Sequence, residues 1–368
     1  MINPGQKKKK MMKKSDWADL PMEILRMIME KLFWSERLPS CLVCKTWHEC
    51  FLEIQNDEQF LPWVMTMEQG GICKLGDPSK QASNIVEGAG THDVLGYADA
   101  CASRYGWVLF LNNLNDHDQY ILYSPFTNEV IKLPILIKDY TSVATFSHSP
   151  GSPNCMAIVF SAKNRKISIK TCQPGDKSWK IFEFKGDKVN IIGQVVCVGD
   201  FVYCFYSDDD WKLGAFNIKQ QELKVSSGIL PMNTDHFNSL FVAFNGDILL
   251  HSFSSNKPWS DQYWRFDLSE DKWVVVEDEI MKKHVIFDGC TSFTVPAVRD
   301  ARQSAGMVHS FKDYLSDFSC LPFHADLTLR GPEVRHHRWL NGDYKWLKKD
   351  YKQLDKIWIQ PPFQRIWR

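Results

Sequence analysis

Apolar residues recur at helical spacing in the first part of the chain. Pro21 stands where a helix would begin, because the first helical position needs no amide donor. The apolar positions behind it lie three or four residues apart, at Ile24, Leu25, Ile28 and Leu32. A second apolar cluster follows at Leu42, Val43, Cys44 and Trp47. A segment of about 40 residues buries too little surface to fold alone, so we expect another domain or a second protein to cover its remaining apolar face.

From Trp63 onward the period changes from helical to strand-like. Short runs rich in β-branched and aromatic residues are separated by polar turns, and no long helical period appears. Tight turns join neighbouring runs, as at residues 198–200 and 244–247. The pattern predicts a small all-α unit followed by a large all-β domain.

A weak internal repeat marks the turns of this second region. Each unit joins two strands through a polar turn that is followed by Trp or Leu. The four units are residues 123–133, 173–179, 216–223 and 266–273. Their spacing of about 40–50 residues is that of a β-propeller blade. We expect the Asp or Asn of each turn to bond its own backbone, and the Trp or Leu to fill the space between neighbouring blades. A β-sandwich with similarly spaced hairpins is the alternative.

The region after Asp300 follows this repeat least well. Residues 301–309 alternate poorly where a blade strand is expected, and the basic group at residues 335–338 indicates either a solvated loop or a contact with an acidic partner. Large aromatic residues nevertheless predict a final blade or a closing strand. They are Trp339, Tyr344, Trp346, Trp358 and Trp367.

Charge and composition restrict the function. Lys and Arg number 44 and balance 44 Asp and Glu, which argues against a general binder of nucleic acid or membranes. No apolar run approaches the roughly 18–20 residues that span a bilayer, and the start lacks the apolar core of a secretory signal. The 11 cysteines are therefore expected to be reduced thiols, with the protein in the nucleus and/or cytoplasm and not secreted.

Candidate chemistry is sparse. Cys41, Cys44, His48 and Cys50 share part of the spacing of a zinc knuckle, but their helical, apolar context favours core cysteines. The chain contains no G-x-S-x-G elbow, phosphate-binding loop or H-E-x-x-H motif. We expect no catalytic residue, no metal and no cofactor. The Lys-rich stretch at residues 7–14 indicates either a nuclear-import signal or a solvated tail.

The order of residues between Ser15 and Gln55 resembles an F-box. The matching positions are Leu20-Pro21, Ile24-Leu25, Leu32, Leu42-Val43-Cys44-Lys45 and Trp47. The resemblance implies a three-helix unit that docks on the Skp-type adaptor of a cullin–RING ubiquitin ligase, while a C-terminal domain recruits the substrate. Pro39 departs from the pattern and predicts a short or kinked second helix. An ordinary helical hairpin that packs on its own C-terminal domain is the alternative.

The second region resembles plant F-box proteins with a KIB-type, kelch-like β-propeller, a domain formerly of unknown function. The similarity runs from about Trp63 to Pro362. It is carried by Leu75–Pro78, Ala102-Ser103 with Gly106-Trp107, Leu122–Pro125 with Thr127, Ile131 with Leu133-Pro134, Phe266–Leu268 with Trp273, and Trp358–Pro361. The resemblance implies a propeller that presents a substrate-binding face.

These observations predict a disordered basic tail (1–14), an F-box (15–55), a linker (56–62) and a β-propeller-like substrate-recruitment domain (63–368). The expected function is that of a non-catalytic substrate receptor of an SCF-type ubiquitin ligase. The alternatives are a non-degradative F-box scaffold and a propeller with its own ligand-binding or enzymatic pocket. The expected partners are the Skp-type adaptor, through it the cullin–RING ligase, and an unknown protein substrate, with no membrane or nucleic acid.

Two groups of residues are the candidate binding sites. The adaptor-binding residues, some of which are expected to face the F-box core instead, are Leu20, Pro21, Ile24, Leu25, Leu42, Val43 and Trp47. Substrate binding is expected on two polar rim loops at residues 112–119 and 251–262, because loops at a propeller rim are free to vary. The candidate residues in these loops are Asn115, His117, Lys257 and Trp259, and Trp259 either forms an exposed hot spot or folds back onto a blade.

Overall fold

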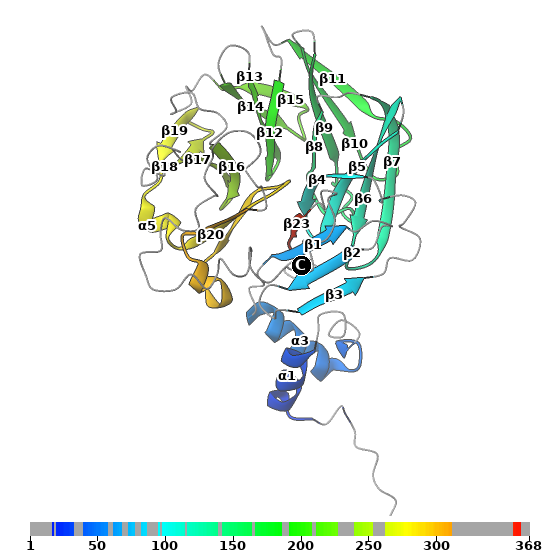
Figure 1. Ribbon diagram of the computed structural model, residues 1–368, viewed down its shortest axis with the longest axis vertical. Helices are drawn as coiled ribbons and strands as arrows, with labels where there is room; N and C mark the ends of the chain where they lie inside the picture. Colours follow the sequence, from blue (N-terminus) through cyan, green and yellow to red (C-terminus); the bar gives the residue numbers. More distant parts are fainter. Residues whose placement is uncertain are drawn as a thin grey trace, which may run out of the picture. The chain divides into compact units, whose positions relative to one another are not determined.

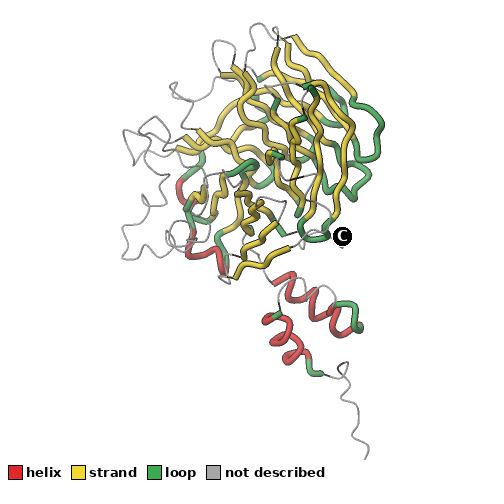
Figure 2. The backbone as a smooth tube through the Cα atoms, turned by 45° about the vertical axis from the view of Figure 1, so that its right-hand side comes forward, coloured by secondary structure: helices red, strands yellow, loops and turns green. Residues whose placement is uncertain are grey.

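The chain divides into two compact units, Met1–Gln59 with Phe363–Arg368, and Phe60–Pro362. The computed structural model describes residues 17, 20–32, 40–57, 62–67, 73–77, 82–86, 95, 98–114, 116–138, 142–163, 166–185, 191–207, 211–226, 239–252, 262–310 and 356–361. The described helices of the first unit and the strands that dominate the second are distinguished by colour in Figure 2.

Two helices form the described part of the first unit, α1 (Met22–Lys31) and α3 (Lys45–Asp57). The carbonyl of Pro21 accepts the amides of Ile24 and Leu25, so Pro21 begins the first turn of α1. The two helices share one apolar core, because apolar side chains recur on one face of each helix. Its buried members are Leu25, Met29, Cys41, Trp47, Cys50, Phe51 and Ile54.

The second unit consists mainly of four-stranded antiparallel sheets, which we call blades 1 to 5 (Figure 1). Blades 2 to 4 are built from consecutive strands, blade 1 includes a distant strand, and the sheet of blade 5 continues into three further strands. Blade 1 contains β1 (Trp63–Met67), β2 (Cys73–Asp77), β3 (Ala82–Val86) and the distant β23 (Lys356–Ile359). Blade 2 contains β4 (Asp99–Arg104), β5 (Trp107–Asn113), β6 (His117–Ser124) and β7 (Glu129–Ile137). Blade 3 contains β8 (Val143–Phe146), β9 (Ala157–Lys163), β10 (Lys166–Cys172) and β11 (Lys180–Lys185).

Blades 4 and 5 continue the same order. Blade 4 contains β12 (Ile191–Val198), β13 (Phe201–Ser207), β14 (Trp211–Asn217) and β15 (Glu222–Val225). Blade 5 contains β16 (Ser239–Phe244), β17 (Asp247–Ser252), β18 (Gln262–Asp267) and β19 (Lys272–Val275). Its sheet is extended at β16 by β21 (Phe293–Pro296), β20 (His284–Asp288) and β22 (Val308–Ser310). Two short helices, α5 (Asp278–Met281) and the 3-10 helix η3 (Arg299–Ser304), flank these strands.

The inner strands of successive blades meet around a common centre. Contacts run from β23 to β4, from β4 to β8, from β8 to β12 and from β12 to β16. In blade 1, β23 pairs with β1 in antiparallel register, with Trp63 opposite Ile359 and Val64 opposite Trp358. The predicted closing strand is therefore confirmed at Trp358. The other late aromatic residues, Trp339, Tyr344, Trp346 and Trp367, lie outside the described residues.

The polar turns of the repeat bond their own backbone, as predicted. In the turn between β14 and β15, Asn217 Oδ1 accepts the amides of Lys219 and Gln220, both at 2.9 Å. In the turn between β18 and β19, Asp267 Oδ1 accepts the amides of Ser269 and Glu270 at 3.0 and 3.2 Å. Each turn also contains a residue with positive φ, and in the four units these residues are Asn128, Gly175, Gln221 and Asp271.

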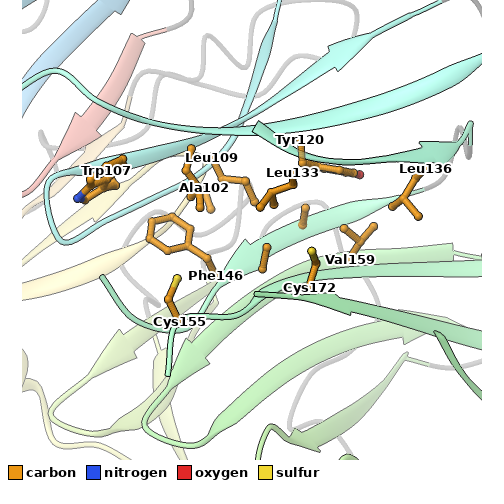
Figure 3. Close-up of a cluster of buried hydrophobic side chains, with 13 residues drawn as sticks. Ala102, Trp107, Leu109, Tyr120, Leu133, Leu136, Phe146, Cys155, Val159 and Cys172 are labelled. Carbon is orange, nitrogen blue, oxygen red and sulfur yellow. The ribbon is translucent and has the colours of Figure 1, made fainter. Parts of the chain in front are cut away.

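The large residue that follows the turn packs between neighbouring blades. Trp179 of blade 3 lies against Tyr120 of blade 2 with ring centroids 5.7 Å apart, and its indole Nε1 donates to the carbonyl of Pro134 at 2.7 Å. Figure 3 shows the apolar cluster that these two blades share. Leu223 and Trp273 occupy the corresponding positions between blades 3 and 4 and between blades 4 and 5. The predicted role of these residues is confirmed.

The predicted rim loops are shorter than the sequence indicated. Strand β5 extends to Asn113 and β6 begins at His117, so most of the predicted loop at residues 112–119 belongs to a hairpin. His251 is buried in β17 and stacks on Tyr263, with ring centroids 4.5 Å apart. The polar character of residues 112–119 and of His251 predicts loops, but strand pairing and aromatic stacking keep these residues inside the sheets. Residues 301–309, which alternate poorly where the repeat would place a blade strand, form most of η3 and the start of β22.

We predict that replacing Trp358 destabilises the second unit. Trp358 is buried against Phe287, with ring centroids 4.9 Å apart. Because Trp358→Ala leaves a cavity at the closing strand, the free energy of unfolding should fall by about 3–5 kcal/mol. Urea unfolding measures this change. Val275→Ala is the matched control, because its side chain is 69% exposed and its cost should stay within about 0.5 kcal/mol. Equal costs for both variants would contradict the closing role.

We predict that Asp267 makes stability depend on acid pH. The hydroxyl of Ser269 and the amide of Glu270 bond to Asp267 and lower the pKa of its carboxyl. A lowered folded-state pKa adds stability above the unfolded pKa of about 3.9, and this stability is lost as the pH falls through the folded value. The stability difference between the wild type and Asp267→Ala should therefore shrink between pH 6 and pH 3. Urea midpoints at stepped pH test this, and a difference that grows in acid is the opposing result.

Candidate functional site

The outer side of α1 carries exposed apolar side chains. Leu25 and Met29 face the core of the first unit, whereas Ile24 and Met27 are 43% and 55% exposed. Residues three apart lie on one side of a helix, so Ile24 and Met27 form one short apolar row. This row lies outside the core that α1 shares with α3.

The turn before α3 exposes two more apolar side chains. The amide of Val43 donates to the carbonyl of Ser40, and this turn directs Cys41 into the core. Leu42 and Val43 point outward and are 81% and 56% exposed. Large apolar residues that stand exposed on one small unit make it a candidate for a binding surface. We call Ile24, Met27, Leu42 and Val43 the N-terminal apolar set.

The seven predicted adaptor-binding residues divide into two classes. Leu25 and Trp47 are buried in the core, and Leu20 packs partly against it. Pro21, Ile24, Leu42 and Val43 are exposed. Sequence reasoning left out Met27, although its position three residues after Ile24 signals the same helix face. It also left out Trp17, which is 60% exposed and whose carbonyl accepts the Trp47 indole at 2.9 Å.

The cysteines of the first unit belong to its core. Cys41 and Cys50 are buried among apolar residues, and burial raises the pKa of both thiols. In the part of the chain that the structure describes, no three His, Cys, Asp or Glu side chains are placed to hold a metal ion. The core interpretation of these cysteines accounts for their positions.

Thiols in the blades are held protonated by burial. Burial raises the pKa of Cys73, Cys172 and Cys204 to about 12, and that of Cys155 to about 11. The thiolate is the nucleophilic form of cysteine, so these groups are inert at neutral pH. Their chemistry is that of small apolar side chains.

Of the predicted substrate-binding residues, the structure describes His117. It is exposed at the start of β6, opposite Ile137 of β7. Asn115, Lys257 and Trp259 lie outside the described residues. Sequence reasoning missed the apolar neighbours of His117, since Ile135 and Ile137 are 54% and 82% exposed on the outer strand of blade 2.

A polar segment crosses between the inner strands of blades 2, 4 and 5. Thr291 Oγ1 accepts the amide of Ser103 from β4 at 3.0 Å. Ser292 Oγ accepts the side-chain amide of Gln194 from β12 at 3.3 Å and donates to Asp288 Oδ1 at 3.0 Å. The carbonyl of Ser292 accepts an amide from β16. These groups satisfy one another inside the unit, so they hold the inner strands together.

Among the helices that the structure describes, none has the length and apolar character that a membrane crossing requires.

Comparison with known proteins gives one family. The model of the KIB1-4 beta-propeller matches residues 81–308. An F-box/kelch-repeat protein of Arabidopsis thaliana is 26% identical over 95% of this chain and 96% of its own length. Two F-box proteins of the same plant are 26% and 28% identical, and these matches cover 48% and 51% of this chain and 44% and 51% of the relatives.

Solved structures are less similar. TolB from Acinetobacter baumannii matches 56% of this chain and 49% of its own chain, with a TM-score of 0.36 and 13% identity. This likeness is too partial to define the fold.

We predict that neighbouring apolar residues in the first unit differ in their effect on stability. Leu25 is fully buried, so Leu25→Ala should lower the free energy of unfolding by about 2–5 kcal/mol. Leu42 is 81% exposed, so Leu42→Ala should change it by no more than about 0.5 kcal/mol. Thermal unfolding followed by the helical circular-dichroism signal compares the two. A large cost at Leu42 would place its side chain in the core.

Proposed function

The chain belongs to the KIB1-4 beta-propeller family, and on that premise we propose that it is the substrate receptor of an SCF-type ubiquitin ligase. In this proposal residues 15–55 form an F-box that binds the Skp-type adaptor, residues 56–62 are a linker, and the propeller binds a protein substrate. The exposed N-terminal apolar set is the observation that carries the proposal. Relatives that are named F-box proteins support it.

The N-terminal apolar set has the chemistry of an adaptor interface. Burial of a Leu or Val side chain yields about 1.5–3 kcal/mol, so Leu42 and Val43 together account for a substantial part of a specific affinity. Leu25 and Trp47 contribute to binding indirectly. Their packing in the core holds α1 and α3 in place, and these helices carry or adjoin the exposed residues. Interface energy is concentrated in a few such residues, which the rest of the surface shields from water.

The proposed mechanism is positional. The F-box fixes the receptor to the ligase, the propeller holds the substrate, and a substrate lysine meets the charged conjugating enzyme at high effective concentration. The bond-forming chemistry belongs to other subunits, so the proposal assigns no catalytic residue and no cofactor to this chain. The proposal places the protein in the nucleus and/or cytoplasm, where its partners act.

We predict that charges in the N-terminal apolar set abolish adaptor binding. The double variant Leu42→Asp with Val43→Asp should weaken binding of purified Skp-type adaptor by at least about 100-fold, because two buried apolar contacts are replaced by buried charges. Surface plasmon resonance with the full-length chain measures the change. The matched control is Ile137→Asp with Val275→Asp, which charges two exposed apolar positions of the second unit and should leave adaptor affinity unchanged.

The alternatives give different results in the same experiment. Failure of the folded wild type to bind the adaptor would reject the F-box assignment and favour a propeller that acts alone. Binding with no ubiquitin transfer to any co-purified protein in a reconstituted ligase would favour a non-degradative scaffold. Equal loss in the control variant would show that the effect comes from added charge.

A further inference from the structure

The guanidinium of Arg104 joins two neighbouring inner strands. Arg104 ends β4, and its Nη1 donates to the carbonyl of Phe146 at the end of β8, 3.2 Å away. Its Nη2 donates to the hydroxyl of Tyr105 at 3.2 Å, and Cys197 of β12 belongs to its electrostatic surroundings. The side chain is half-buried and fixed in place from several sides.

The hydrogen-bond and ring contacts that the structure describes for this cation are all uncharged. They are a carbonyl, a phenol and the ring of Tyr105, whose centroid lies 5.0 Å from Arg104 Cζ. Within the described ranges, no Asp or Glu forms an ion pair with Arg104. Arg265 differs, because its guanidinium meets Asp247 at 2.8 Å. Charged side chains that are withdrawn from water are usually paired with an opposite charge, and the described contacts of Arg104 include none.

The turn at Tyr105, directly after Arg104, holds the Tyr105 ring beside the guanidinium. Tyr105 has a φ of 54°, in the left-handed region that non-glycine residues avoid. The equivalent turn of blade 5 uses Asn245 and Gly246, which tolerate this conformation better. The Tyr105 hydroxyl donates to the carbonyl of Ser147 at 3.2 Å, which fixes its ring beside Arg104.

The protonation state of Arg104 suits an anion site. Burial acts to lower the pKa of the Arg104 guanidinium, but the pKa nevertheless lies above its ordinary value. The guanidinium is therefore a permanent cation. It has five N–H donors in a planar fork that matches the two oxygens of a carboxylate or the oxygens of a phosphate.

We propose that Arg104 is the anchor of an oxyanion-binding site at one end of the inner strands, which binds a carboxylate or phosphate group on a protein partner. The partner supplies the missing negative charge, and the fixed guanidinium binds it without losing further side-chain freedom. The site lies entirely in the second unit and goes beyond the proposed function, because it requires no adaptor.

The experiment measures stabilisation of the full-length chain by small oxyanions. Sodium acetate and, separately, sodium phosphate replace sodium chloride at constant ionic strength, and the Tm of the β-rich unit is followed by circular dichroism. A ligand that binds the folded state raises the Tm in a saturable way, by about 2–4 °C at tenfold excess over its Kd. The wild type should show this rise. A response to acetate identifies carboxylate as the preferred group, and a response to phosphate alone identifies a phosphorylated partner.

Matched variants separate binding from general salt effects. Arg104→Gln should lose the rise, and Arg104→Lys should keep less than half of it because lysine lacks the fork. Arg265→Gln, which removes an arginine that already has a carboxylate partner, should keep the full rise. No rise in the wild type, or an equal rise in the wild type and Arg104→Gln, would overturn the proposal. If Arg104→Gln does not fold, the comparison of wild type with Arg104→Lys decides, and equal saturable rises there would also overturn it.

Discussion

The sheets of the second unit bury apolar faces against neighbouring sheets. Apolar clusters join blade 2 to blade 3, blade 3 to blade 4 and blade 4 to blade 5. A further cluster joins Val64 and Trp358 of blade 1 to Phe287 and Phe293 of β20 and β21. Because a blade cannot bury both faces alone, stability comes from the contacts between neighbours. The hydrogen-bonded turns, the Trp residues that lie between blades (Trp179 and Trp273) and the closing strand β23 all help to keep neighbouring sheets packed together.

The sequence predicts the features that repeat and misreads those that depend on a distant neighbour. Trp179 and Trp273 could be placed between blades because each follows a polar turn at a fixed offset. His251 could not be placed, since its burial depends on stacking against Tyr263 of the next strand. In the first unit the apolar positions were found as a set, but α1 and α3 together decide that Leu25 faces inward and Ile24 outward. The sequence did not indicate a site at Arg104, because the strands β4 and β8 that its side chain joins lie far apart in the chain.

The two candidate surfaces differ in physical character. The N-terminal apolar set offers area for burial, so its affinity comes from excluded water and is little affected by salt. The Arg104 site offers a fixed charge, so its affinity falls as ionic strength rises. In the proposed function the two units therefore bind their partners by different forces, and rising ionic strength weakens the contact at Arg104 more than the contact at the N-terminal apolar set. The proposed receptor, which keeps one permanent partner and exchanges others, is served by this difference.

Closure of blade 1 by β23 has a consequence for the newly made chain. The partners Trp63 and Ile359 are separated by about 300 residues, and a ribosome adds roughly 5–20 residues per second. During synthesis, β1 therefore stays unpaired with β23 for about 15–60 s. An open strand edge pairs readily with other chains. We therefore expect the nascent chain to bind chaperones until β23 emerges, and we expect interrupted translation products to be removed by quality control rather than to accumulate.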